Sequence, residues 1–200
     1  HTSLYRVDGF GQYRVLGQTA DDAAGEAFDK FAKMLGLGYP GGVHVDRLAA
    51  VGNPEAYRFP RALLKENNYD FSFSGLKAAA HRQLQAMEAE EIEKNKQDLC
   101  ASYQRAIVEV LVEKLKRASM NEKVNRVVFT GGVRANSGLR ILGQEWAREA
   151  GVQLMIPPLR FCTDNAAMIG LAGVLRFATG DRSGAALSPS PRSLPADFLI

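Results

Sequence analysis

One segment, residues 124–156, constrains the possible folds of this chain more than any other. Its first part, 124–130, is rich in the β-branched and aromatic residues of a buried strand, and two glycines follow it. A helical pattern then covers 135–150, and a second strand is predicted at 152–156. Strand, helix and strand in this order favour two parallel strands joined by a crossover helix. The segment therefore predicts an α/β domain.

The part of the chain before this segment predicts a hairpin and an amphipathic helix. Short β-prone runs at 2–7 and 13–16 flank a glycine-containing turn, which is typical of a β-hairpin. Residues 19–22, Thr-Ala-Asp-Asp, have the form of a capping box and are expected to open the helix. The apolar face of this helix is expected to consist of Ala24, Ala27, Phe28, Phe31 and Leu35.

The middle of the chain is predicted to be mostly helical. A turn at Pro40-Gly41-Gly42 precedes a short helix over 43–51, and longer helices are expected at 76–94 and 99–119. Period-two alternation at 70–74 indicates a short strand.

These elements predict the organisation of the chain. We expect residues 1–185 to form one α/β unit, in which about 43–119 is a helical insertion beside the sheet. A last helix is predicted at 164–179. The remaining residues, 186–200, are rich in Ser and Pro and are expected to form an extended tail.

Composition narrows the function classes without choosing one. The chain is 46% hydrophobic and 24% charged, as in a globular protein, and its net charge of +3 is too small to imply nucleic acid by itself. Cys100 and Cys162 form no Cys-x-x-Cys pair, which argues against a zinc ribbon or a redox pair. The longest nearly apolar run, 166–175, is far shorter than the roughly 20 residues of a membrane span. We therefore expect a cytoplasmic protein without a membrane segment.

The helix after the hairpin carries the first candidate binding residues. Four of its charged side chains share one face: Asp22, Glu26, Asp29 and Lys33. Such a face is either simply solvated or a carboxylate cluster that holds hydroxyls, amines or a metal.

Two further candidates lie where helices begin. Gly131-Gly132 would let a ligand approach the backbone, and the next helix offers N–H groups to an anion or a polar nucleotide. The spacing matches neither a Walker A motif nor GxGxxG, and a tight strand–helix connection is the alternative. Asp164 opens the last helix, where a helix cap is the alternative to a functional role. The three histidines, at positions 1, 44 and 81, lack the spacing of a complete metal site.

Five runs together resemble one family. In chain order they are LGQTADDAAGEAFDK, LGLGYPGG, DFSFSGLK, GGVRANSGLR and CTDNAAMIG. They resemble, at similar spacing over about residues 1–180, the TsaD family of tRNA adenosine threonylcarbamoyltransferases. The opening His1-Thr2 resembles the end of that family's Ser-Gly-Gly-His-Thr loop.

The resemblance implies a fold and an activity. The family has the actin-like ATPase (ASKHA) fold with two α/β lobes, so residues 1–185 would be the second, C-terminal lobe. The chain would then be a fragment that lacks the first lobe. The implied reaction transfers threonylcarbamoyl from threonylcarbamoyl-adenylate to the exocyclic amine of the tRNA adenosine beside the anticodon. We expect this fragment alone to be inactive.

The resemblance also implies site residues and a cofactor. Asp29, Gly42, Asp46 and Asn136 fall on positions that hold the adenylate, and no catalytic residue is assigned. Asp164 falls on the carboxylate ligand of one divalent metal ion, iron with zinc as the alternative. The family's two histidine ligands belong to a His-Met-Glu-Gly-His motif that would precede His1.

The resemblance also implies partners, and other functions remain as alternatives. The implied partners are tRNA, a degenerate TsaB-like paralogue and, in bacteria, a TsaE-like P-loop ATPase. The alternatives are a metalloprotease, because the family was once described as a glycoprotease, a non-catalytic scaffold of the same fold, or a sugar kinase. The chain contains neither His-Glu-x-x-His nor a visible nucleophile triad, which argues against a protease.

Overall fold

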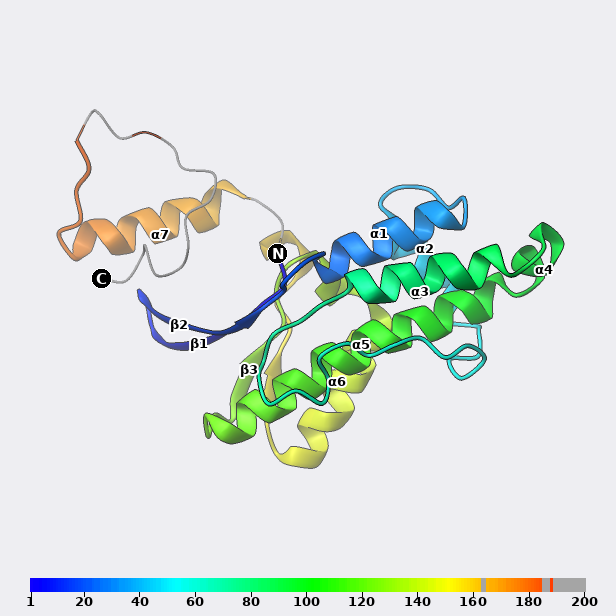
Figure 1. Cartoon of the computed structure of the whole chain (residues 1–200). Coiled ribbons are helices and arrows are strands. Elements are labelled where there is room, and N and C mark those ends of the chain that lie inside the picture. The colour runs from blue at the N-terminus through cyan, green and yellow to red at the C-terminus, as the bar shows by residue number, and fades with distance from the viewer. Residues whose placement is uncertain (163–164, 185–187, 189–200) are drawn as a thin grey trace.

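The computed structural model describes residues 1–162, 165–184 and 188, and it is a mixed α/β structure that is mostly helical (Figure 1). The strands are β1 (Ser3–Gly9), β2 (Gln12–Gln18), β3 (Arg126–Val128) and β4 (Gln153–Met155). The α-helices are α1 (Ala24–Met34), α2 (Gly41–Ala49), α3 (Ser74–Gln85), α4 (Ala89–Lys94), α5 (Lys96–Asn121), α6 (Ser137–Ala150) and α7 (Ala166–Ala178). Short 3-10 turns, η1 (Gly132–Ala135) and η2 (Leu159–Phe161), precede α6 and α7.

The strand–helix–strand prediction for the second half is confirmed. Strands β3 and β4 pair in parallel, with Val127 opposite Leu154, and α6 is the crossover between them. The strands are three residues long each, shorter than predicted. The small sheet and α6 share a hydrophobic cluster with α5 that contains Val127 and Trp146.

The predicted hairpin is also confirmed. Strands β1 and β2 pair antiparallel around a turn in which Gly11 has a φ of 76°. Arg6 on β1 donates to the Glu122 carboxylate at a distance of 2.9 Å, and Arg14 on β2 bonds to the same carboxylate. These ion pairs join the hairpin to the C-terminal end of α5.

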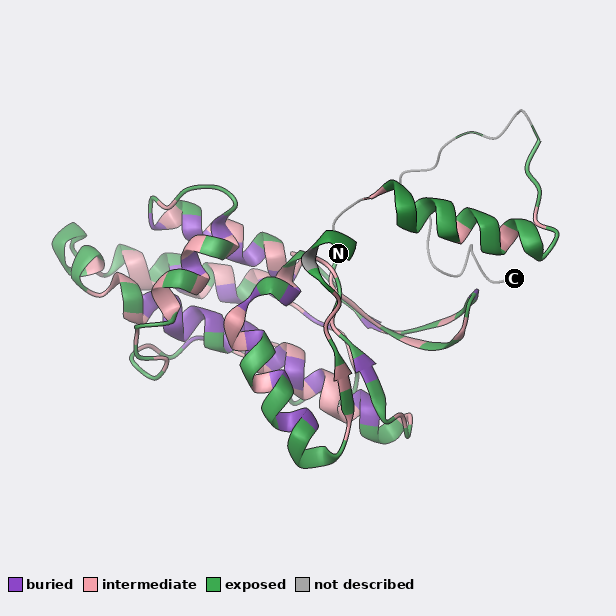
Figure 2. Cartoon of the chain, turned by 180° about the vertical axis from the view of Figure 1, so that it is seen from behind, coloured by how far each residue is buried: buried purple, intermediate pink, exposed green. Residues whose placement is uncertain are grey.

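The main core lies where α1, α2 and α5 meet, and Figure 2 shows buried residues concentrated in this helical body. Phe31 of α1 stacks on Tyr103 of α5 with ring centroids 3.8 Å apart, and Phe59 meets both rings edge-on. The Tyr103 hydroxyl donates to the Ala27 carbonyl at 3.2 Å. The predicted apolar face of α1 is thus confirmed, and Tyr103 of α5 packs against it.

Helix α5 also connects the two halves of the structure. It belongs to both hydrophobic clusters, and it packs against α2 on one side and α6 on the other. The residues predicted as an insertion, about 43–119, therefore contribute a large share of the core.

Three local predictions were wrong. Helix α1 begins at Ala24, and instead of a capping box the Thr2 hydroxyl accepts from the Ala24 N–H at 2.9 Å. The predicted strand at 70–74 is a single bridge between Thr19 and Phe71. The helix predicted over 76–94 is interrupted after Gln85, which separates α3 from α4.

The last helix stands apart from the body (Figure 1). Helix α7 matches the predicted helix within the described residues, and none of its described side chains is buried. The predicted tail, 186–200, lies outside the described residues except for Ser188. Among the described helices, none is both long enough and apolar enough to cross a membrane.

The start of α3 is held by a carboxylate from before α1. Asp21 accepts hydrogen bonds from the Ser72 and Ser74 hydroxyls and from the N–H groups of Phe73 and Ser74, at 2.5 to 3.2 Å. Desolvation acts to raise the pKa of Asp21, but these hydrogen bonds outweigh it and lower the pKa to about 2. The charged form of Asp21 is therefore part of the folded structure.

We expect Asp21→Ala to lower the free energy of unfolding by about 1 kcal/mol near neutral pH, as for other lost helix caps. Because the folded pKa lies below the ordinary 3.8, this stabilisation is present above about pH 4 and is lost as the pH falls towards 2. Urea unfolding of both proteins across this range measures the difference. Asp8→Ala is the control, since Asp8 makes an exposed ion pair with Arg6. A difference that stays constant with pH would contradict the assignment.

Candidate functional site

Asp29 and the Pro-Gly-Gly turn meet at the start of α2. The Asp29 Oδ1 atom accepts from the N–H of Gly41 at 2.7 Å and from that of Gly42 at 3.4 Å. A Cβ on Gly41 would lie 2.5 Å from the Ala32 Cβ and 2.8 Å from the Asp29 Cα. Gly41 is therefore needed for the close approach of α2 to α1, and Asp29 caps α2 from a neighbouring helix.

Asp46 makes the next connection, from α2 to α6. Its carboxylate accepts from the Ser137 N–H at 3.0 and 3.1 Å and from the Ser137 hydroxyl at 2.7 Å. The N-terminus of α6, predicted as a place for an anion, thus already faces a carboxylate of the chain itself.

Asn136 is buried directly before α6, and both ends of its amide are engaged. Its Oδ1 accepts from the Leu139 N–H at 2.9 Å, which caps the helix. Its Nδ2 donates to Oε1 of Gln104 on α5 at 2.6 Å. Asn136 is only 7% exposed, so its amide has a fixed orientation.

All four predicted substrate-binding residues therefore lie along one connected path, which we call the α1–α2–α6 junction. They are Asp29, Gly42, Asp46 and Asn136. The adjoining glycines, Gly131 and Gly132, leave open space, because a Cβ built on either would have no described atom within 4 Å apart from those of the glycine itself and its chain neighbours. Gly131 has a φ of 80°, which favours glycine. The junction thus combines fixed polar groups with room beside the glycine loop.

The predicted metal ligand, Asp164, lies outside the described residues. Within the described ranges, no group of three or more His, Cys, Asp and Glu side chains is placed to hold a metal ion. Next to Asp164, Asn165 caps α7 by accepting from the Met168 N–H at 2.9 Å. The described residues do not by themselves form a metal site.

Two other members of the predicted charged face, Asp22 and Glu26, belong to an ion-pair network. Asp22 pairs with Lys30 at 2.7 Å and with Lys77 of α3 at 3.3 Å, and Lys30 also pairs with Glu26. The Lys30 hydrogen bond is the main cause that lowers the pKa of Asp22. Lys30 follows Glu26 by four residues and could have been found from the sequence, whereas Lys77 comes from a distant helix.

Sequence reasoning also missed Arg134, in the loop between Gly132 and Asn136. Its side chain is buried, at 4% exposure, and its Nε and Nη2 atoms have no hydrogen-bond partner among the described residues. A loop arginine would ordinarily be expected at the surface, and nothing in its spacing indicates burial.

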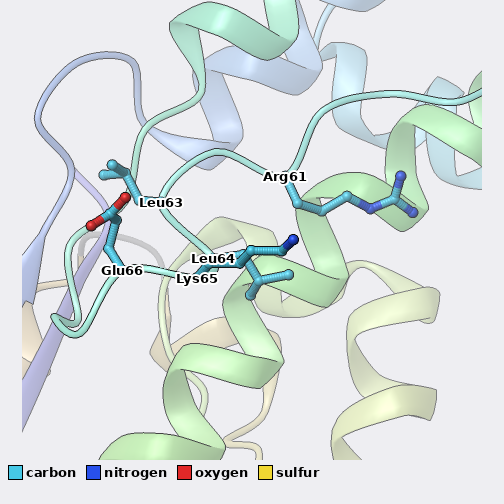
Figure 3. Close-up of a pocket in the computed structure, with 5 residues that line it drawn as sticks. All are labelled: Arg61, Leu63, Leu64, Lys65 and Glu66. Carbon is cyan, nitrogen blue, oxygen red and sulfur yellow. The ribbon is translucent and has the colours of Figure 1, made fainter.

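A separate shallow pocket of about 500 Å³ lies in the loop before α3 (Figure 3). The lining residues are Arg61, Leu63, Leu64, Lys65 and Glu66. Two arginines fix this loop to α5: Arg61 pairs with Glu109 at 2.8 Å, and Arg117 donates to the Leu64 carbonyl at 2.8 Å. No residue of the junction lines this pocket.

Comparisons with known proteins agree on one family. Residues 1–171 match the family model of TsaD, tRNA N6-adenosine threonylcarbamoyltransferase. Proteins named tRNA N6-adenosine threonylcarbamoyltransferase are 56% identical in Bdellovibrio bacteriovorus, over 99% of this chain, and 51% identical in Geobacter sulfurreducens, over 100%. The matched parts cover 57% and 58% of those relatives. The chain thus spans less than two thirds of their length.

The two glycines at the start of α2 are expected to respond differently to alanine. Gly41→Ala places a Cβ against backbone and should cost about 1–3 kcal/mol of folding free energy. A Cβ on Gly42 would make an ordinary 3.8 Å contact with Phe28, so Gly42→Ala should be neutral or stabilise α2 by up to about 1 kcal/mol. Urea unfolding of the two variants measures this, and equal effects would contradict the described approach of α1 and α2.

Proposed function

The chain belongs to the TsaD family of tRNA N6-adenosine threonylcarbamoyltransferases, and on this premise we propose the reaction of the full-length protein. It transfers threonylcarbamoyl from threonylcarbamoyl-adenylate to the exocyclic amine of the tRNA adenosine beside the anticodon. The observation that carries the proposal is the match of residues 1–171 to the family model. Relatives with this name at 51–56% identity support it.

The α1–α2–α6 junction is the proposed adenylate site. Asp29 uses Oδ1 to cap α2, and its Oδ2 accepts no hydrogen bond from the described residues. We assign Oδ2 to a hydroxyl or amine donor of the adenylate. The side-chain amide nitrogen of Asn136 carries two hydrogens. One is donated to Gln104, and we assign the other to the nucleotide.

The proposed reaction depends mainly on how the protein orients the two substrates, and less on covalent catalysis by the protein. The adenosine amine attacks the carbamoyl carbon, a C–N bond forms, and the bond to the phosphate oxygen breaks as AMP leaves with its electron pair. The amine also gives up one proton, which the phosphate of the leaving AMP or water takes up. Residues held by two or more hydrogen bonds, as in the junction, suit this role because fixed geometry contributes several kcal/mol to such reactions.

The cofactor and partners are part of the proposal. We propose one divalent metal ion, iron with zinc as the alternative, for which Asp164 is the ligand that this chain would supply. A divalent ion bound there would stabilise negative charge on the adenylate oxygens. Besides tRNA, we propose a TsaB-like paralogue and a TsaE-like ATPase as partners, in the cytoplasm.

We further propose that residues 1–185 are the C-terminal lobe of an actin-like ATPase fold and that α7 lies against the other lobe. The support is the surface of α7, which exposes large apolar side chains at 37% to 66% of their area. These residues are Met168, Ile169, Leu171, Val174, Leu175 and Phe177. Large exposed apolar side chains gathered on one helix are typical of an interaction site.

The reaction is tested by incubating the full-length protein with unmodified tRNA and threonylcarbamoyl-adenylate, followed by mass spectrometry of the nucleosides. We expect threonylcarbamoyladenosine to form. Asp29→Asn, which keeps an acceptor at Oδ1, should reduce transfer about fivefold or more through loss of one charged hydrogen bond. Glu26→Gln on the same helix is the control. Cleavage of a protein substrate or phosphorylation of a sugar, without tRNA modification, would refute the proposal.

The lobe arrangement predicts that Leu171→Asp affects the melting temperature of the full-length protein but not that of the 200-residue chain. In the full-length protein the carboxylate would be buried against the other lobe, and the melting temperature should fall by several degrees. In the 200-residue chain Leu171 is already exposed, and no change is expected. Val51→Asp, at an exposed position of the helical body, should be neutral in both. Equal shifts for Leu171→Asp in the two proteins would contradict the arrangement.

A further inference from the structure

The amide of Asn136 has one partner that no motif of the sequence includes. This partner is Gln104, on α5 and 32 residues away, whose Oε1 accepts from the Asn136 Nδ2 at 2.6 Å. Both side chains are buried, each at 7% exposure. A short hydrogen bond between two buried amides fixes the rotation of both.

The space for Gln104 is made by a glycine. A Cβ on Gly138, in the first turn of α6, would lie 2.8 Å from the Gln104 Nε2 and 3.4 Å from the Asn136 Oδ1. The absence of a side chain at this position therefore lets the Gln104 amide reach Asn136. Gly138, Gln104 and Asn136 form one interlocked group at the start of α6.

The hydrogen bond sets the direction of the remaining donor on Asn136. Its Oδ1 is oriented by the Leu139 N–H and one Nδ2 hydrogen by Gln104, so the second Nδ2 hydrogen has a single direction. Without Gln104, the cap on Leu139 alone would orient the amide.

We infer that Gln104 is a positioning residue for the nucleotide, which acts through Asn136 without contacting the ligand. The inference rests on the proposed function, in which Asn136 contacts the adenylate. Gln104 should therefore affect the affinity for the nucleotide and the KM for the adenylate, while the kcat stays the same.

The test uses the full-length protein, with AMP binding measured by calorimetry and transfer measured with tRNA. Gln104→Leu keeps the volume but removes the acceptor, and it should weaken AMP binding and raise the KM about fivefold, with kcat unchanged. Gly138→Ala, which displaces the Gln104 amide, should have a similar effect.

A matched control separates positioning from lost stability. Ser102 lies on the same helix, is fully buried, and donates to the Asn53 carbonyl while accepting from the Tyr57 N–H. Ser102→Ala should lower the melting temperature and leave AMP affinity unchanged. An equal loss of affinity in Ser102→Ala and Gln104→Leu would overturn the inference.

A double-mutant cycle distinguishes this inference from the proposed function. In an Asn136→Ala background, Gln104→Leu should cause no further loss of AMP affinity. Additive losses would overturn the positioning role. If Asn136→Ala alone leaves AMP affinity unchanged, the assignment of Asn136 to the nucleotide fails. If Asn136→Ala weakens binding and Gln104→Leu does not, only the role of Gln104 fails.

Discussion

The N–H groups at the start of an α-helix need acceptors, and at α1, α2 and α3 side chains from elsewhere in the chain provide them. Thr2 caps α1, Asp29 caps α2, Asp21 caps α3 and Asp46 faces the first turn of α6. Each of these contacts joins two distant segments of the chain. The need of one helix for hydrogen-bond acceptors therefore fixes the position of another segment. The junction is a consequence of this arrangement, because its carboxylates connect α1 to α2 and α2 to α6.

Much of the secondary structure could be predicted because the relevant information is local. The spacing of apolar residues identified α1 and its buried face, and the order of β-prone and helical runs identified the parallel pair of β3 and β4. The prediction of a capping box was wrong because the residue that caps α1, Thr2, is 22 residues from Ala24. The start of α1 was therefore decided by a tertiary contact.

The same division between local sequence information and tertiary contacts applies to the candidate site. Motif spacing selected Asp29, Asp46 and Asn136, but it could not say which of their atoms are already engaged. That depends largely on partners far along the chain, such as Gly41 for Asp29, Ser137 for Asp46 and Gln104 for Asn136, which lie 12, 91 and 32 residues away. For Asp29, a structural role and a ligand-binding role are compatible, because Oδ1 caps α2 and Oδ2 accepts no hydrogen bond from the described residues.

Two consecutive residues of α5 face two different parts of the molecule. The Tyr103 ring stacks under α1, and the next side chain, Gln104, holds the amide before α6. A change that tilts this helix would disturb the core and the junction together. In a library of random variants scored only for activity, α5 would therefore be mistaken for a ligand-binding element. Separate measurements of protein abundance and of specific activity would be required to interpret the effects of variants in α5.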